Sequence, residues 1–223
     1  MSDSNKPQFD PYRRIARFFP LIGGLLEGFI GTIRKDMLRL LRQKGQSRIL
    51  DLGCGTGDLS RIFADEGFRP VGLDLSRGML ARARITADRF PFFPLVLGDA
   101  AHLPFKPLFD AAVMRFVFHE MDAGQREVVW KELLRVIRPG GLLILIDFTV
   151  PEERGLYARL GAFMIHFIEH RMVSIHPPHY LNFRDLMDKG GASAWFARQG
   201  IEVAESRRYF GGSIGLIAVR MNG

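Results

Sequence analysis

The 223 residues are 47% hydrophobic and 25% charged, which fits one globular domain with a buried core and excludes a disordered chain. Cys54 is the only cysteine, so a disulfide framework and a cysteine-based zinc site are excluded and a reducing, cytoplasmic location is expected. The net charge of +7 is concentrated in residues 1–47, which contain nine Lys and Arg residues and four Asp and Glu residues. This basic segment could contact phosphate, an anionic membrane or an acidic substrate. The alternative is an ordinary solvated helix surface.

The N-terminal segment contains one long apolar stretch, Phe18–Ile33. It has 16 residues and includes Pro20 and Glu27, whereas a membrane span needs about 20 apolar residues. Glu27 also argues against a secretion signal. An amphipathic helix that lies on a surface or covers a pocket fits better, so residues 1–47 are predicted to form a helical lid.

The central part of the chain predicts strands that alternate with helices. The expected strands are 48–52, 70–74, 95–97, 111–114 and 142–146, and nearly all of their residues are apolar. Ser76 and Asp122 are suitable N-caps for two of the helices between them. Apolar strands that alternate with helices indicate a parallel sheet covered on both faces.

The last third of the chain has a different pattern. A long helix is expected from Glu152 to about His170, followed by an irregular stretch at 171–184 that contains two prolines. Residues 201–209 and 213–219 resemble two strands around a Gly-Gly turn, which predicts an antiparallel hairpin at one edge of the sheet.

Three carboxylates follow successive predicted strands: Asp51, Asp74 and Asp99. The carboxyl ends of parallel strands share one edge of a sheet, so these residues should line one crevice. The glycine-rich turn at 53–57 would let a ligand approach the backbone closely. An acid after the second strand is placed to accept ribose hydroxyls, which favours a nucleoside-containing ligand, although each Asp alone could be a helix cap.

The spacing of the glycines distinguishes between nucleoside ligands. Dinucleotide enzymes carry Gly-x-Gly-x-x-Gly in front of a pyrophosphate. Here the pattern is Gly53-x-Gly55-x-Gly57 after Asp51, and an acid there repels a pyrophosphate but suits an α-ammonium group. The sequence also has no Tyr-x-x-x-Lys pair, so an NAD(P)-dependent reductase is the weaker alternative.

Four motifs resemble those of class I S-adenosylmethionine-dependent methyltransferases. Residues 49–57 (ILDLGCGTG) are similar to the first motif, 72–76 (GLDLS) to the ribose motif, 98–101 (GDAA) to the adenine motif, and 134–141 (LRVIRPGG) to the helix and turn before the fifth strand. The match covers about 48–149 in the family's order. It implies a Rossmann-like, doubly wound, mostly parallel seven-stranded sheet of order 3-2-1-4-5-7-6, with an antiparallel C-terminal hairpin.

The resemblance also implies how the chain holds S-adenosylmethionine. Asp51 and the 53–57 backbone would bind the methionine portion, Asp74 the ribose, and the segment from Asp99 the adenine. Cys54 is expected to be a small loop residue and not a nucleophile. The complete expected set is Asp51, Gly53, Cys54, Gly55, Thr56, Gly57, Asp74, Leu75, Met79, Asp99, Ala100 and Arg115.

The acceptor side should lie just after the fourth strand, at 115–121. Methyl transfer from a sulfonium is an in-line displacement, so a base is needed only when the acceptor carries a proton. His119 is the candidate catalytic residue that accepts or orients this proton; otherwise it is a structural histidine beside the pocket. Arg115 needs a carboxylate partner, either within the protein, where Asp147 is one candidate, or on the cofactor.

Several motifs narrow the class of acceptor. No Asn/Asp-Pro-Pro-aromatic turn follows the fourth strand and no nucleic-acid-binding module is visible, so a small-molecule or lipid-like acceptor is expected and nucleic acid is not. Residues 12–19 and 211–219 resemble segments of the ubiquinone/menaquinone-biosynthesis and lipid methyltransferases, which favours a quinone or a phospholipid. Those quinone enzymes have Arg-Asn-Val after strand four, whereas this chain has Arg-Phe-Val at 115–117.

The chain is predicted to be one domain with four parts: the lid (1–47), the cofactor core (48–149), a helical cover over the acceptor pocket (150–200) and the hairpin (201–223). The basic, apolar lid (Arg13, Arg14, Arg17 and 18–26) and the apolar stretch 160–168 suit either a peripheral contact with an anionic membrane or ordinary packing. The histidines 166, 170, 176 and 179 match no metal-ligand spacing, so no metal is predicted. A partner subunit that binds the cofactor without catalysis is the remaining alternative.

Overall fold

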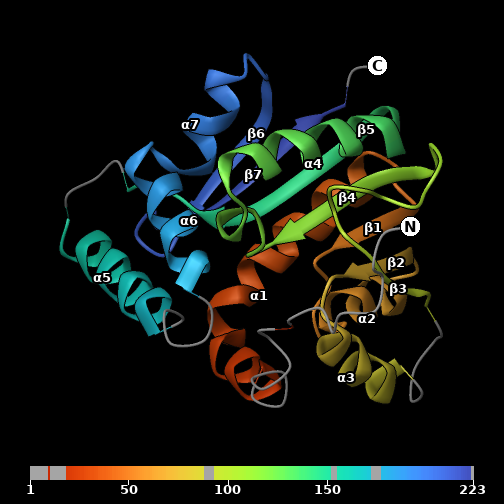
Figure 1. The fold of residues 1–223 in the computed structure, drawn as a ribbon, viewed down its shortest axis with the longest axis horizontal. Helices are drawn as coiled ribbons and strands as arrows, with labels where there is room; N and C mark the ends of the chain where they lie inside the picture. The colour runs from red at the N-terminus through yellow and green to blue at the C-terminus, as the bar shows by residue number, and fades with distance from the viewer. Residues whose placement is uncertain (1–9, 11–18, 88–92, 152–154, 172–176, 222–223) are drawn as a thin grey trace, which may run out of the picture.

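The computed structural model describes residues 10, 19–87, 93–151, 155–171 and 177–221, with the side chains of the first helix described from residue 31 onward. These residues contain a seven-stranded sheet of order β3-β2-β1-β4-β5-β7-β6 (Figure 1). β7 runs antiparallel to β5 and β6, and the other described pairs are parallel. The predicted order and hairpin are therefore confirmed. The strands are β1 (Arg48–Leu52), β2 (Arg69–Asp74), β3 (Leu95–Leu97), β4 (Phe109–Arg115), β5 (Ile137–Phe148), β6 (Val203–Tyr209) and β7 (Ile214–Arg220).

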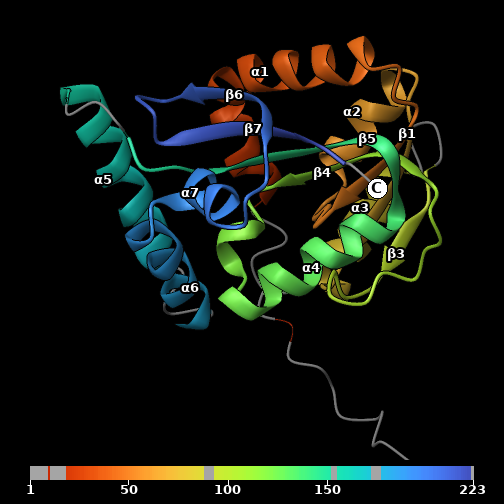
Figure 2. The ribbon, with the colours of Figure 1, turned by 90° about the horizontal axis from the view of Figure 1, so that it is seen from above.

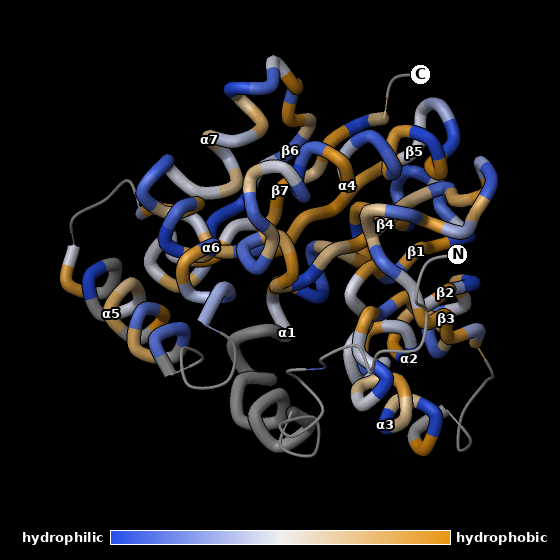
Figure 3. The backbone as a smooth tube through the Cα atoms, in the orientation of Figure 1, coloured by the Kyte–Doolittle hydropathy of each residue, from blue (hydrophilic) through white to orange (hydrophobic). Residues whose placement is uncertain are grey.

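Helices cover both faces of the sheet, as Figure 2 shows for α1 on one side and α4 and α7 on the other. Side chains alternate along each strand, so Ile49 joins the cluster under α1 and α2, whereas Leu50 joins the cluster under α4 and α7. Hydrophobic residues accordingly follow the central strands in Figure 3. The helices are α1 (Phe19–Gln43), α2 (Asp58–Asp65), α3 (Arg77–Ala87), α4 (Ala123–Val136), α5 (Leu156–Arg171), α6 (Pro177–Asp188) and α7 (Gly191–Arg198), with a 3-10 turn η1 (Phe118–Glu120) after β4.

Local side-chain hydrogen bonds fix the starts of two predicted helices. The Ser76 hydroxyl accepts a hydrogen bond from the Met79 N–H at 3.1 Å at the start of α3. Asp122 and Gln125 form a reciprocal capping box at the start of α4, with bonds of 2.8 and 2.9 Å. Both predicted N-caps are therefore present. β5 is longer than the predicted strand 142–146 because the chain extends from Ile137.

The prediction of an irregular stretch at 171–184 is wrong from residue 177 onward, where α6 begins. Pro177 and Pro178 occupy its first turn, where a missing N–H costs nothing because those groups have no partner within the helix. α6 then buries His179, Phe183 and Leu186 against the rest of the molecule. The two prolines thus start a helix instead of preventing one.

The second half of α1 is a core helix. Its buried side chains, including Met37 and Leu41, pack against β1, β4 and β5 from one face. The lid residues Arg13, Arg14 and Arg17 lie outside the described residues, as do the side chains of 18–26. Among the described residues, no helix is both long and apolar enough to cross a membrane.

Candidate active site

The carboxyl ends of β1, β2 and β4 bring the expected polar residues to one edge of the sheet. Asp74 is the last residue of β2, Arg115 the last of β4, and Asp51 the last but one of β1. Asp51 pairs in register with Gly72 of β2 and Val113 of β4, so it lies between the two neighbouring strand ends. Asp99 follows β3 by two residues at the same edge.

The glycine turn between β1 and α2 leaves open space next to its backbone. Gly53, Gly55 and Gly57 all have positive φ, from 55° to 77°, a region that favours glycine. A Cβ on Gly53 would lie 2.3 Å from a Val117 methyl carbon, so this turn packs directly on the segment after β4. A Cβ on Gly55 would meet no atom within 4 Å, which leaves room for a ligand against the backbone.

Asp74 is held by backbone N–H groups and keeps acceptor capacity. Its two oxygens accept hydrogen bonds from the Gly55 N–H at 2.7 Å and the Ser76 N–H at 2.8 Å. Burial raises its pKa, and hydrogen bonds from the backbone of Ser76, Gly55 and Leu75 oppose the rise. A carboxylate has about four acceptor positions, so at least one remains for a ribose hydroxyl.

Asp10 also lies at this end of the site, and sequence reasoning missed it. Its carboxylate accepts hydrogen bonds from the Ser76 hydroxyl at 2.8 Å and the Gly78 N–H at 3.0 Å, at the start of α3. Its charge adds to the rise of the Asp74 pKa. No motif or spacing in the N-terminal segment indicated this contact.

Asp51 is a buried carboxylate, only 2% exposed. It accepts a hydrogen bond from the Ser60 hydroxyl at 2.5 Å. Burial raises its pKa to about 6, although the Ser60 bond and the charge of Arg115 act in the opposite direction. Above that pH Asp51 is an anion that attracts a cationic group, which the α-ammonium of a methionine portion would supply.

Arg115 makes no ion pair with any carboxylate in the described part of the chain, so the expected internal partner is not found. Asp147, the candidate partner, is occupied by His119, whose Nδ1 lies 2.8 Å from an Asp147 oxygen. The half-buried Arg115 instead acts through its charge on Asp51.

The end of the site at Asp99 is more open. Asp99 is exposed, and one of its oxygens accepts a hydrogen bond from the Ala101 N–H at 2.9 Å, next to the half-buried Ala100. Met79 is buried, whereas Leu75 is 56% exposed, as expected of a side chain that a ring could cover. Cys54 is buried and burial raises the pKa of its thiol, so it fits the role of a small loop residue. Thr56 is buried and bonds to Asp58 at 2.8 Å.

The segment after β4 turns sharply beside this edge. Phe116 has φ of 56°, an uncommon conformation for a residue with a side chain. One Asp147 oxygen accepts the N–H groups of Phe118 at 2.9 Å and His119 at 3.2 Å, which fixes the turn. Burial lowers the pKa of His119, but Asp147, Glu169 and Glu120 together raise it to about 9.

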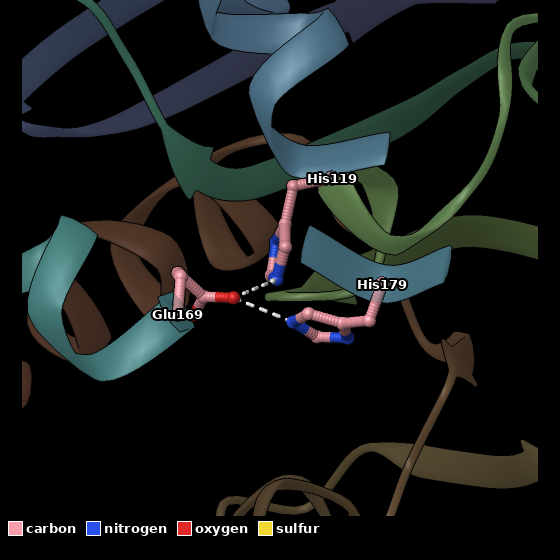
Figure 4. A group of neighbouring side chains, drawn as sticks. All are labelled: His119, Glu169 and His179. Carbon is pink, nitrogen blue, oxygen red and sulfur yellow. Dashed lines mark hydrogen bonds and ion pairs between the residues drawn. The ribbon is translucent and has the colours of Figure 1, made fainter. Parts of the chain in front are cut away.

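A cluster of histidine and carboxylate side chains lies behind this turn. His119, Glu169 of α5 and His179 of α6 point toward one another (Figure 4). His179 Nε2 lies 2.5 Å from a Glu169 oxygen, and His119 Nε2 lies 3.7 Å from the same oxygen. Sequence reasoning did not join these residues. His166 and His170, which lie on α5, are exposed and stay outside the cluster.

Comparisons with known proteins bear on the family of the chain. A family model described as a methyltransferase domain matches residues 50–145. The demethylmenaquinone methyltransferase of Beutenbergia cavernae is 31% identical over 214 residues, which cover 92% of this chain and 87% of that protein. The 2-phytyl-1,4-naphtoquinone methyltransferase of Thermosynechococcus vestitus is 36% identical over 154 residues, or 65% of this chain and 66% of that protein.

A solved structure shows the same fold at low sequence identity. The N-methyltransferase NodS from Bradyrhizobium japonicum has a TM-score of 0.63 and 17% identity, covering 88% of this chain and 98% of that one. The open backbone at Gly55, the acceptor positions of Asp74 and the buried anion Asp51 fit S-adenosylmethionine, which is the cofactor of this enzyme. The chain belongs to the class I S-adenosylmethionine-dependent methyltransferases.

Proposed function

We propose that this enzyme methylates a quinone-type acceptor that carries a lipid-like tail. The names of the two relatives support the class of acceptor. The observation that carries the proposal is the aromatic cluster beside the turn after β4, where Phe116 packs on Phe148 with ring centroids 5.3 Å apart and Phe183 packs on Phe148 at 5.5 Å. An apolar, aromatic surrounding suits a flat quinone ring and excludes water from the reaction.

The proposed cofactor contacts follow the chain along the sheet edge. Asp51 and the backbone of Gly53, Cys54, Gly55, Thr56 and Gly57 bind the methionine portion, and Arg115 binds its carboxylate. Asp74 binds the ribose hydroxyls. Leu75 and Met79 pack on the adenine, while Asp99 and the Ala100 N–H bind its polar edge. These assignments rest on placement at one edge, on the burial of Asp51 and the partial burial of Asp74, and on the open space at Gly55.

S-adenosylmethionine supplies an electrophilic methyl group on a sulfonium, and the residues of the chain align the acceptor with it. When the acceptor is a ring carbon, a carbon–sulfur bond breaks, a carbon–carbon bond forms and the acceptor loses a proton. We assign His119 the role of orienting the acceptor side. Asp147 fixes its imidazole through Nδ1, so the ring has one defined orientation next to the turn that faces the cofactor.

The proposal includes peripheral contact of a cytoplasmic enzyme with an anionic membrane. Leu156, Phe163 and Phe167 are 60–70% exposed and lie on one face of α5, because their spacings of seven and four residues return to the same side of a helix. Arg159, on the same helix, is also exposed. An apolar face with a cation nearby favours adsorption to an anionic bilayer, from which a quinone could be drawn.

Labelled methyl transfer tests the acceptor. Purified enzyme is incubated with methyl-labelled S-adenosylmethionine and anionic vesicles that contain a reduced demethylated naphthoquinone, and the label is followed into lipid and aqueous fractions. Label on the quinone supports the proposal. Label confined to water-soluble compounds in a cell extract would refute it, and cofactor binding without transfer to any extract fraction would favour the non-catalytic partner subunit.

The Asp74→Ala variant tests the cofactor contacts. It removes a partly buried carboxylate with its remaining acceptor capacity, and one hydrogen bond to a charged group contributes about 1.5–3 kcal/mol. We expect the affinity for S-adenosylmethionine to fall at least ~10-fold by calorimetry. Unchanged affinity in a folded Asp74→Ala protein would contradict the assignment.

A further inference from the structure

The cluster of His119, Glu169 and His179 joins three separate segments inside the protein. The three residues lie in η1, α5 and α6 and are all buried. One donor atom from each lies within 4.8 Å of the other two. Figure 4 shows the two imidazoles and the carboxylate converging on one point. The fold thus gathers two nitrogen donors and one oxygen donor at one point, and Glu169 and His179 have no part in the proposed methyl transfer.

Both histidines direct their other ring nitrogen at a second carboxylate. His119 Nδ1 lies 2.8 Å from Asp147, and His179 Nδ1 lies 3.7 Å from Glu120. Asp147 is itself fixed, since it accepts the N–H groups of Phe118 and Phe148. A metal-binding histidine typically turns its second nitrogen to a carboxylate in this way, which sets the orientation of its ring.

The charge of the cluster favours a cation. Two buried carboxylates, Asp147 and Glu169, and the partly exposed Glu120 face the two imidazoles, so negative charge surrounds the point where the donor atoms converge. The hydrogen bonds of the buried Arg126 run elsewhere, to the carbonyls of Phe118 and Asn182 and to Asp185, so Arg126 does not occupy this point.

We propose that His119, Glu169 and His179 bind a divalent transition metal ion, for which Zn²⁺ has the matching donor set. Two imidazoles and one carboxylate form known three-ligand zinc sites that keep a fourth position open. With bonds of about 2.0–2.1 Å in a tetrahedron, donor atoms lie about 3.3 Å apart. The distances from Glu169 to the two histidines, 3.7 and 2.5 Å, lie on either side of that value. The ion would cross-link α5 and α6 to the turn after β4 through these three ligands. This inference does not rest on the identity of the acceptor.

Metal analysis of the full-length chain tests the site. The protein is produced without a polyhistidine tag, and its metal content is measured by mass spectrometry before and after chelation. The metal-free protein is then titrated with Co²⁺, whose visible absorption reports coordination. The variants are Glu169→Gln and His179→Asn, with His170→Asn as the matched control, since His170 is an exposed neighbour of Glu169 on the same helix.

We expect one metal ion per chain in the wild type and in His170→Asn, and less than a tenth of that in the two ligand variants. Asp147→Asn should bind the ion 10–100-fold more weakly, because it removes the carboxylate that orients His119. If the ligand variants do not fold, the metal ligands of the wild-type protein are identified by X-ray absorption spectroscopy, which should show imidazole coordination. Trace metal and no Co²⁺ spectrum in the folded wild type, or equal metal in the ligand variants, would overturn the proposal.

Discussion

Asp51 should make cofactor binding depend on pH. Its carboxyl group is 2% exposed, and burial raises its pKa from 3.8 to about 6 in the free protein. In the proposed contact the α-ammonium group of the cofactor needs Asp51 as an ionised partner, so protonation of Asp51 would compete with binding. We expect the affinity for S-adenosylmethionine to be constant above about pH 7 and to fall about tenfold for each pH unit below about 6.

The same burial links Asp51 to stability. The rise of the pKa from 3.8 to about 6 corresponds to roughly 3 kcal/mol. Because the pKa of this acid is higher in the folded state, the proton favours folding. The cofactor-free protein should therefore be most stable, as far as Asp51 is concerned, below about pH 4, and lose up to roughly 3 kcal/mol as the pH rises through 6.

Asp51→Asn separates the two effects. The amide oxygen can still accept the hydrogen bond from Ser60, whereas the buried charge is gone. At pH 8 we expect a higher free energy of unfolding, by about 1–3 kcal/mol, together with weaker cofactor binding. Urea unfolding and calorimetric titration of the same samples from pH 5 to 8 measure both quantities.

Ser60→Ala is the matched control for this experiment. The Ser60 hydroxyl lowers the Asp51 pKa, so its removal should move the inflection of the affinity profile to higher pH. An affinity that is flat from pH 5 to 8 in the wild type would refute the reasoning. An unchanged profile in Asp51→Asn would assign the pH dependence to another group.

Three further variants test the glycine turn, the acceptor side and the membrane contact. Gly53→Ala places a Cβ 2.3 Å from a Val117 methyl carbon at a φ of +73°. We therefore expect the free energy of unfolding, measured with urea, to fall by about 2–4 kcal/mol. A decrease below about 0.5 kcal/mol would mean that the turn adjusts to the new side chain without strain. His119→Asn should retain cofactor affinity but lower kcat at least ~10-fold, because the acceptor is no longer oriented; a change in KM alone would point to a purely structural residue. Replacement of Phe163 and Phe167 by Ser should lower binding to anionic vesicles at least ~10-fold in a flotation assay, since each exposed Phe that becomes buried in the bilayer contributes roughly 1.5–3 kcal/mol. Equal flotation would show that α5 does not contact the membrane.

Local patterns in the sequence were sufficient for much of the fold. β1 and β3 have the predicted bounds, 48–52 and 95–97, because short apolar runs between turn residues define them. The caps at Ser76 and Asp122 involve bonds to residues three positions away. The family's motifs supplied the strand order, which the structure confirms.

Local patterns failed where the outcome depends on packing. The Pro-Pro pair at 177–178 indicated an irregular segment. A helix forms there nevertheless, because α6 buries one face against the rest of the molecule and because proline is tolerated in the first turn of a helix. The sequence also did not indicate that the second half of α1, within the predicted lid, packs its apolar face on the sheet. Burial against distant strands cannot be derived from neighbours along the chain.

The sequence by itself determined most strands and the acids at their carboxyl ends, because strand ends are set by local periodicity and parallel strands end at one edge. Only the tertiary structure decided which groups those acids meet. It left Arg115 without a direct ion pair among the described residues, although its charge acts on Asp51, and it brought His119, Glu169 and His179 together from segments fifty and ten positions apart. The physical reason is that such contacts form when α5 and α6 pack beside the sheet, and long-range packing has no signature in sequence spacing.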